Sequence, residues 1–285
     1  MLKIAIPNKG RLSEESLKIL RSIGLKIELE ERRLFLEAPK YSVIFARAQD
    51  IPGFVEEGVA DIGITGLDLV LETGKKVKKL LDLNFGYCRL AIAVPEKSKI
   101  SEVKHIPNGA KVATSFPNLT QEYFRKKGKK INIVEISGAA EVAPQLGVAE
   151  LIADLVETGT TLKTNYLREI GTIVESRAVV VANEQALEQE EKKTKINEFI
   201  AALASVINAS GRRYLMANVP KEVLEEVKSL IPGISGPTVM NIMGSESMVA
   251  VHAVVNEEEI NGIIAILKRL GATGILVVPI ERVVL

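Results

Sequence analysis

Apolar residues recur along the chain in short runs separated by longer, helix-like stretches. Leu2–Ile6 has the pattern of a buried strand, and Ser13–Ile23 carries apolar residues at helical spacing. The same alternation predicts strands at Tyr41–Ala46, Asp61–Thr65, Leu90–Val94, Lys111–Thr114 and Ile131–Glu135, and helices at Asp50–Glu57, from about Leu67, and at Asn118–Lys127. Short apolar strands bounded by Gly or Pro are typical of parallel strands covered on both faces. The pattern therefore predicts an α/β fold with parallel sheets.

Changes in this pattern divide the chain into two α/β lobes. Near residue 90 the chain leaves one unit for another, and the apolar run Arg177–Asn183, followed by the helical stretch Glu184–Ala209, indicates a return. We assign residues 1–90 plus 178–211 to lobe I and residues 91–177 to lobe II. Two such lobes leave a cleft, which is a usual place for a small-molecule site.

The remaining residues, 212–285, show a β-α-β-β-α-β order. The expected elements are, in turn, Arg213–Asn218, Pro220–Leu230, Thr238–Met243, Met248–Val255, Glu257–Leu270 and Ile275–Pro279. This order predicts a small ferredoxin-like domain. A loop rich in Gly and Pro, Ile231–Thr238, is by spacing alone a connector.

Composition narrows the functional classes. With 47% hydrophobic and 26% charged residues, the chain has ample material for a core, and its net charge of +1 gives no reason to expect nucleic acid or membrane as a partner. No apolar run has the length of a membrane span, and the N-terminus lacks a signal-peptide core. Cys88 is the only cysteine and the two histidines are far apart, which disfavours a disulfide or a His/Cys metal site. We expect a cytoplasmic protein.

Leu151–Leu162 is the most informative segment. An apolar strand, Leu151–Val156, carries Asp154 and then breaks into the turn Glu157–Thr161. A turn of small, hydroxylated residues that opens a helix presents N–H groups and hydroxyls to one point, where a phosphate can bind. The two acids would repel that phosphate but could accept hydrogen bonds from a sugar diol beside it, so the segment suits a ribose 5-phosphate. From these residues alone, an ordinary turn with a Thr N-cap and no ligand stays equally open.

Other loops at strand ends are candidates too. Asn8–Arg11 follows the first strand, at the edge where open α/β sheets bind ligands, and its Lys9 and Arg11 could pair with phosphates. A solvated turn is the alternative. Gly63–Asp68 and Asn84–Arg89 are weaker candidates of the same kind. Nothing in the sequence resembles a Ser-His-Asp set or a nucleophile elbow.

Taken together, these segments resemble the ATP phosphoribosyltransferase family. The motifs that carry the resemblance are Pro7–Leu12, Gly58–Asp68, Glu141–Gly147 and Asp154–Leu162, and the tail around Pro232–Thr238 resembles the regulatory domain of the long form. The resemblance implies two periplasmic-binding-protein-like lobes with the active site between them. It also implies transfer of the 5-phosphoribosyl group of phosphoribosyl diphosphate to N1 of ATP, with release of diphosphate, as the first step of histidine biosynthesis.

The family resemblance also implies a metal cofactor, two inhibitors and an oligomeric assembly. Mg²⁺ would be carried mainly by the diphosphate, with its protein ligands unknown. Histidine would inhibit by binding the C-terminal domain, AMP is a further candidate inhibitor, and dimers and hexamers are expected. Displacement at the anomeric carbon needs positioning and electrostatics more than a covalent nucleophile, which agrees with the lack of a nucleophile–base pair.

By analogy with the family, the substrate residues can be named. The 5-phosphate would be held by Glu157, Thr158, Gly159, Thr160, Thr161 and Leu162. Asp154 would bind the ribose hydroxyls. The segment Lys9, Gly10 and Arg11 would approach the diphosphate or the ATP phosphates as charge stabilisers. Glu141, Asp68, Cys88 and Arg89 complete the set, the last three on the nucleotide side of the cleft.

The histidine contacts would be Asn218, Ile234, Ser235 and Thr238. Some relatives have Asp at the position of Asn218, and Asp could pair with the inhibitor's ammonium group as an ion, whereas Asn offers a neutral acceptor. Two other functional classes remain open, a solute-binding module and a regulatory paralogue without turnover. A chain that carries both the phosphate-type loop and the C-terminal domain favours a self-contained enzyme.

Overall fold

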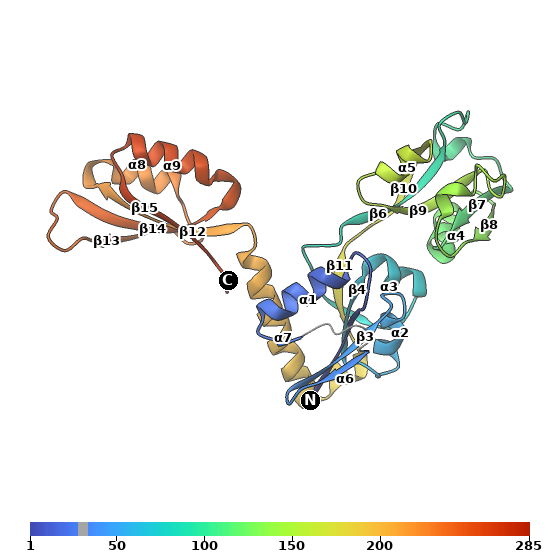
Figure 1. Ribbon diagram of the computed structural model, residues 1–285, viewed down its shortest axis with the longest axis horizontal. Helices are drawn as coiled ribbons and strands as arrows, with labels where there is room; N and C mark the ends of the chain where they lie inside the picture. Colours follow the sequence, from blue (N-terminus) through green and yellow to red (C-terminus); the bar gives the residue numbers. More distant parts are fainter. Residues whose placement is uncertain (28–33) are drawn as a thin grey trace. The chain divides into compact units, whose positions relative to one another are not determined.

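The computed structural model describes residues 1–27 and 34–285. The chain forms two compact units, Met1–Ile200 and Ala201–Leu285. Figure 1 shows the elements of each unit, with two sheets in the first and one in the second. No helix in the described part of the chain has the length and apolar character needed to cross a membrane.

A six-stranded sheet forms lobe I, with the order β2-β3-β1-β4-β11-β5. Its strands are β1 (Leu2–Pro7), β2 (Phe35–Glu37), β3 (Tyr41–Ala46), β4 (Ile62–Gly66), β5 (Lys78–Asp82) and β11 (Ala178–Ala182), and its helices are α1 (Ser13–Ser22), α2 (Ile51–Glu56) and α3 (Leu67–Thr73). β1 pairs in parallel with β3 and β4. All five residues of β4 and of β11 are buried, as expected for strands covered on both faces.

A five-stranded sheet forms lobe II, with the order β10-β6-β9-β7-β8. Its strands are β6 (Cys88–Pro95), β7 (Ala110–Thr114), β8 (Ile131–Glu135), β9 (Leu151–Val156) and β10 (Leu167–Ser176), with helices α4 (Pro117–Lys126) and α5 (Thr160–Thr164) and 3-10 turns η1 (Val103–His105) and η2 (Ala140–Val142). β7 runs parallel to β8 and β9, whereas β6 runs antiparallel to β9 and β10. The sheets are therefore mixed, and the expectation of purely parallel sheets is corrected.

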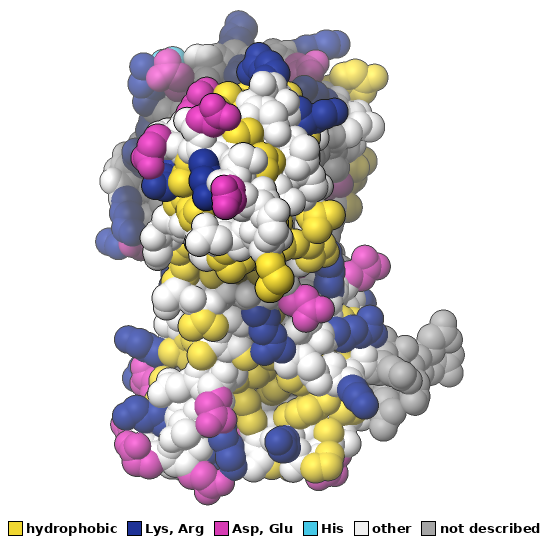
Figure 2. Space-filling model, turned by 90° about the vertical axis from the view of Figure 1, so that its left-hand side faces the viewer, with side chains coloured by type: hydrophobic (Ala, Val, Ile, Leu, Met, Phe, Trp, Pro, Cys, Tyr) yellow, Lys and Arg dark blue, Asp and Glu magenta, His cyan; other side chains and the backbone are white. Residues whose placement is uncertain are grey.

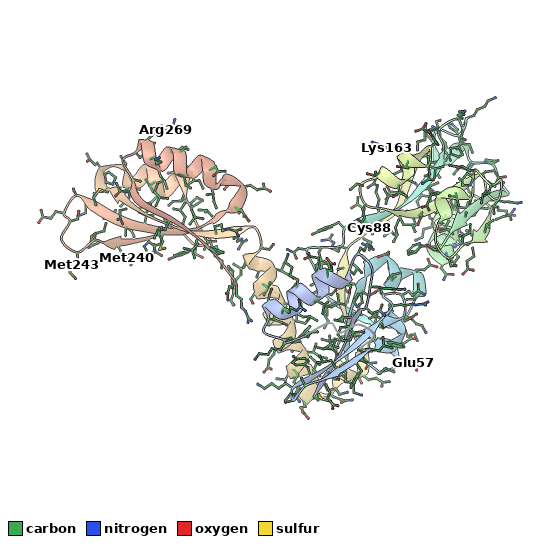
Figure 3. The ribbon with its side chains drawn as sticks, viewed as in Figure 1. Glu57, Cys88, Lys163, Met240, Met243 and Arg269 are labelled. Carbon is green, nitrogen blue, oxygen red and sulfur yellow. The ribbon has the colours of Figure 1, made fainter. Side chains whose placement is uncertain are left out.

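Apart from β2, which pairs antiparallel with β3, the antiparallel strands arise because the chain crosses between the two sheets twice. It passes from β5 to β6 and returns from β10 to β11, and the crossing segments lie side by side, with Cys88 paired to Ser176. Cys88 marks this region in Figure 3. A backbone hydrogen bond of 3.0 Å from Ala178 N to Phe85 O ties the same two segments together. The expected two-lobed α/β architecture is thus confirmed, and we call these paired crossings the hinge.

The helical stretch expected at Glu184–Ala209 is two helices. The first, α6 (Glu184–Glu188), is followed by Gln189, whose backbone is extended at φ −86° and ψ 111°. The second, α7 (Glu190–Ala209), begins directly after Gln189. Asn183 caps α6 by accepting a hydrogen bond of 2.8 Å from Ala186 N.

The second unit has the expected ferredoxin-like order. Its sheet, β13-β14-β12-β15, consists of β12 (Arg212–Pro220), β13 (Thr238–Asn241), β14 (Met248–Asn256) and β15 (Thr273–Pro279). One face is covered by α8 (Leu224–Leu230) and α9 (Ile260–Arg269), which follow the short turns η3 (Lys221–Val223) and η4 (Glu257–Glu259) (Figure 1). Residues along β12 and β14 alternate between buried and half-exposed, as a sheet with one covered face requires. Pro220 ends β12 and does not lie in the first turn of the helix.

Charged side chains of both signs are interspersed over the face shown in Figure 2. This distribution agrees with the near-neutral net charge of +1.

Candidate active site

The turn after β9 depends on a glycine. Gly159 lies in the left-handed region at φ +83° and occupies the N-cap position of α5, so the helix begins without a capping side chain. The hydroxyls of Thr158 and Thr160 lie 3.0 Å apart, and Thr158 Oγ1 is 3.5 Å from Thr160 N. An ordinary turn with a Thr N-cap is therefore not what the structure has. The hydroxyls of Thr158 and Thr160 therefore lie together in the turn.

A cavity of about 290 Å³ lies against this turn. It is lined by Arg11, Glu141, Asp154, Leu155, Val156, Glu157, Thr158, Gly159, Thr160, Thr161 and Leu162. Arg11 comes from lobe I, Glu141 from η2, and the other residues from β9, the turn after it and the start of α5. One cation, several hydroxyls and three acids thus surround a space close in size to small-molecule sites.

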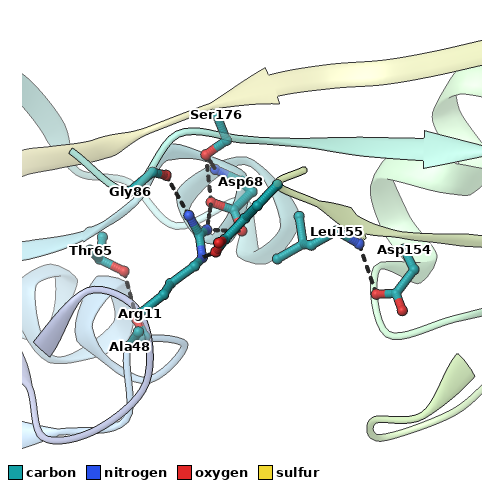
Figure 4. Close-up of polar contacts among 9 residues, drawn as sticks. Arg11, Ala48, Thr65, Asp68, Gly86, Asp154, Leu155 and Ser176 are labelled. Atoms are coloured by element: carbon teal, nitrogen blue, oxygen red, sulfur yellow. Dashed lines mark hydrogen bonds and ion pairs between the residues drawn. The ribbon is translucent and has the colours of Figure 1, made fainter. Parts of the chain in front are cut away.

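Asp154 lies in β9 as a partly dehydrated acceptor. Burial raises the pKa of its carboxyl above the ordinary value, a hydrogen bond from Leu155 N acts in the opposite direction, and the charge of Glu141 raises it further. Oδ1 accepts that hydrogen bond at 2.8 Å, as Figure 4 shows. Because a carboxylate has several further acceptor positions, Asp154 can still accept hydrogen bonds from hydroxyl groups in the cavity.

Arg11 is held from several directions (Figure 4). Its Nη1 donates to the carbonyl of Gly86, and its Nη2 lies 3.4 Å from both carboxylate oxygens of Asp68. Its Nε lies 4.0 Å from Glu157 Oε1, which belongs to the turn of lobe II. The Arg11 side chain is 24% exposed to solvent. It is anchored on lobe I and the hinge, and its remaining side faces the cavity.

A second cavity, of about 220 Å³, lies at the hinge. It is lined by Tyr87, Cys88, Arg89, Glu157, Glu175, Ser176 and Arg177. Arg89 forms a fork with Glu169, with Nη2 2.7 Å from Oε2 and Nε 3.0 Å from both oxygens, and this pairing lowers the pKa of Glu169. Arg89 Nη1 also donates to the Glu157 carbonyl at 3.3 Å. Arg89 therefore fixes the start of the turn after β9.

Several expected residues lie outside the two cavities. Lys9 and Gly10 are exposed on the loop beside Arg11 but do not line either cavity. Asp68 is fully buried, at 0% exposure, behind Arg11 and therefore does not itself line the cleft. Sequence reasoning did not single out Ser176, which contacts Asp68 at 2.5 Å. A serine in a polar strand end gives no sequence signal for this contact across 108 residues.

The expected histidine residues are only partly brought together. Asn218 pairs with Ala250 and Thr238 pairs with His252, which places Asn218 and Thr238 on the same uncovered face of the sheet. Ile234 lines a separate cavity of about 350 Å³ near α9, and Ser235 is exposed.

A metal centre made by protein side chains alone is not found in the described ranges, since no three His, Cys, Asp or Glu residues there could hold an ion together. The acids at the cavity are spread over separate segments.

Comparison with known proteins gives a consistent result. A family model described as ATP phosphoribosyltransferase matches residues 47–205, and one described as the HisG C-terminal domain matches residues 209–282. The ATP phosphoribosyltransferase of Methanocaldococcus jannaschii is 50% identical over 99% of this chain and 100% of its own length. That of Methanopyrus kandleri is 47% identical over 100% of both chains.

A solved structure supports the same assignment. The ATP phosphoribosyl transferase (HisG:HisZ) complex from Thermotoga maritima contains a chain that is 33% identical, with a TM-score of 0.64, covering 72% of this chain and 97% of its own. The chain described here therefore belongs to the ATP phosphoribosyltransferase family, the enzymes of the first step of histidine biosynthesis.

Proposed function

We propose that the cavity between Arg11 and the turn after β9 binds phosphoribosyl diphosphate, while the enzyme transfers the phosphoribosyl group to N1 of ATP. The observation that carries this assignment is the convergence of one anchored arginine, one half-buried carboxylate and a hydroxyl-rich turn on a single cavity. Arg11 suits a diphosphate, Asp154 suits a diol, and the Thr158–Thr161 turn suits a phosphate monoester.

The reaction breaks the bond between the anomeric carbon and the diphosphate oxygen and forms a bond from that carbon to adenine N1. Positive charge develops on the ribose ring and negative charge on the departing diphosphate. Asp154 holds the ring through its hydroxyls, and the turn holds the 5-phosphate, so the carbon is presented in one orientation. Arg11 neutralises the leaving group as charge builds up on it.

Lys9 lies on the same loop as Arg11 and is exposed. We place its ammonium group on the ATP phosphates or the diphosphate, because a long, flexible side chain can reach a ligand that enters the cleft. Mg²⁺ would be carried mainly by the diphosphate and would add to the neutralisation of the leaving group that Arg11 provides. Cys88 and Arg89, at the hinge cavity, are assigned to the nucleotide side.

The C-terminal unit is assigned to regulation. We place histidine on the uncovered sheet face that carries Asn218 and Thr238, with Ile234 and Ser235 on the neighbouring loop. AMP is proposed as a second inhibitor. We also propose that the chain works as a homo-oligomer, a dimer or hexamer, in the cytoplasm.

A glycine substitution tests the phosphate assignment. Gly159→Ala places a side chain at φ +83° and should distort the turn, whereas Gly128→Ala, at φ +68° in the same lobe, introduces the same kind of strain away from the cavity. Gly159→Ala should raise the KM for phosphoribosyl diphosphate and leave the KM for ATP almost unchanged. Gly128→Ala should alter neither. Equal effects of the two variants on the phosphoribosyl diphosphate KM would refute the assignment.

A further inference from the structure

Asp68 is a fully buried acid at the start of α3, with 0% exposure. A carboxylate in such a place needs close hydrogen-bond partners. Ser176 Oγ donates to Asp68 Oδ1 at 2.5 Å, while Arg11 Nη2 lies 3.4 Å from each carboxylate oxygen. The hydroxyl of Ser176 is therefore the nearer partner, and it fixes the carboxylate more tightly than the arginine does.

Two hydrogen bonds join Ser176 and Asp68. Besides donating to the carboxylate, Ser176 Oγ accepts a hydrogen bond of 2.9 Å from Asp68 N, so the two residues close a ring. The same oxygen, Oδ1, also lies against Gly66, where an added Cβ would collide with it. The hydrogen bonds to Ser176 and the close packing on Gly66 therefore hold Asp68 Oδ1 in one position.

The orientation of Asp68 decides where Arg11 points. The guanidinium has two carboxylates within reach, Asp68 at 3.4 Å and Glu157 at 4.0 Å. Glu157 is exposed, at 55% of its side chain, and lies at the cavity. If Asp68 were free to turn away, Glu157 would compete for the arginine and cover the face that a diphosphate needs.

Ser176 also lies at the hinge (Figure 4). It is the last residue of β10 and pairs with Cys88 on the other crossing segment. Gly86, whose carbonyl accepts a hydrogen bond from Arg11 Nη1, precedes Cys88 on that segment. Both segments that join the lobes therefore hold the arginine, one directly and one through Asp68.

We propose that Ser176 is a positioning residue for phosphoribosyl transfer. It orients the Asp68 carboxylate, which in turn keeps Arg11 directed at the diphosphate and away from Glu157. This role rests on the proposed function, in which Arg11 contacts the diphosphate.

The test begins with variants of Ser176 in the full-length enzyme. Ser176→Ala removes the hydroxyl, and Ser176→Thr keeps it on a residue suited to a strand. Ser205→Ala is the matched control, because Ser205 is buried to the same 4% exposure and donates one hydrogen bond of 2.7 Å, to Ala202 O. Thermal unfolding midpoints of all variants are measured beside the KM for each substrate. Ser176→Cys, of similar shape but a weak donor, replaces the alanine variant if that fails to fold.

Ser176→Ala should lower kcat/KM for phosphoribosyl diphosphate about tenfold, the range of one hydrogen bond to a charged group. Ser176→Thr should recover most of that loss, and Ser205→Ala should show none. A Ser176→Ala enzyme that behaves as Ser205→Ala does would overturn the proposal.

A double-mutant cycle with Arg11→Ala separates positioning from a general structural role. If Ser176 acts through Arg11, Ser176→Ala should cause little further loss in the Arg11→Ala enzyme. A full tenfold loss in both backgrounds would overturn the proposal. An Arg11→Ala enzyme with an unchanged phosphoribosyl diphosphate KM would refute the proposed role of Arg11 itself. That failure appears in the single variant and is thereby distinguished from a failure of Ser176 alone.

Discussion

Replacing Asp154 should weaken phosphoribosyl diphosphate binding, and replacing it by Asn should at the same time stabilise the protein. The carboxylate lies in β9 with one oxygen bound to Leu155 N at 2.8 Å, and its other acceptor positions are available to a ligand. Hydrogen bonds to a charged group contribute about 1.5–3 kcal/mol. At about 1.4 kcal/mol per factor of ten, Asp154→Ala should raise the KM for phosphoribosyl diphosphate roughly 10- to 100-fold. The KM for ATP should change far less.

The stability effect follows from the raised pKa of Asp154. Burial is its main cause, so the ionised carboxylate is less favourable in the folded chain than in the unfolded one. A carboxyl group with a raised folded-state pKa contributes stability below the unfolded pKa and loses that contribution as pH rises through the folded pKa. Asp154→Asn keeps an acceptor for Leu155 N without the charge. It should therefore unfold at a higher temperature than the parent at neutral pH, with the difference shrinking as pH falls toward 3.8, the ordinary aspartate value.

Two assays check this reasoning together. Steady-state kinetics with each substrate varied in turn gives the two KM values, and calorimetric unfolding between acidic and neutral pH gives the stability difference. Substrate affinity of the parent should also fall as Asp154 becomes protonated, over a pH range above that of an ordinary aspartate. Asp154→Asn that is less stable than the parent at neutral pH, or Asp154→Ala that raises both KM values equally, would refute the argument.

Further predictions concern three other positions. Glu72 in α3 accepts hydrogen bonds of 2.9 Å from two backbone N–H groups at the start of α4 in the other lobe. In a denaturant titration, Glu72→Ala should therefore lower the free energy of unfolding by about 1–3 kcal/mol. Glu122→Ala, on the exposed side of α4, should change it little in the same titration. Cys88 is buried, and burial raises the pKa of its thiol. Cys88 should therefore react with a thiol reagent at neutral pH much more slowly than free cysteine does. Reaction at the rate of free cysteine would contradict the burial of this side chain. Asn218→Asp should tighten histidine binding by adding an ion pair, and unchanged or weaker affinity by titration calorimetry would count against the proposed inhibitor site.

The sequence predicted the elements whose pattern is carried by continuous apolar runs. β1, β3, β4, β7 and β8 lie within about two residues of their expected positions, and the C-terminal unit has its expected order. β5 was missed because two lysines begin it. β10 was missed because charged residues lie near both of its ends and the strand is mostly half-buried. Parallel and antiparallel pairing could not be distinguished, since the hinge depends on contacts between distant segments.

The candidate site shows the same division. The turn after β9 could be proposed from local sequence, because its acids, hydroxyls and glycine are contiguous. The burial of Asp68 could not, because it depends on Ser176, 108 residues away, and on the approach of Arg11 from a third segment. Local sequence indicates which chemistry a loop can supply, but it does not show which side chain touches the ligand and which one only supports it.

The central claim is that this chain joins ATP to phosphoribosyl diphosphate at the cavity beside Asp154. The most direct measurement combines purified protein with both substrates, Mg²⁺ and excess pyrophosphatase, and follows the near-ultraviolet absorbance of N1-substituted adenine. The parent enzyme should show a rise in absorbance that requires both substrates. The Asp154→Ala enzyme should show a comparable rise only at a much higher phosphoribosyl diphosphate concentration. No rise from folded parent protein, or an Asp154→Ala enzyme indistinguishable from the parent, would contradict the account.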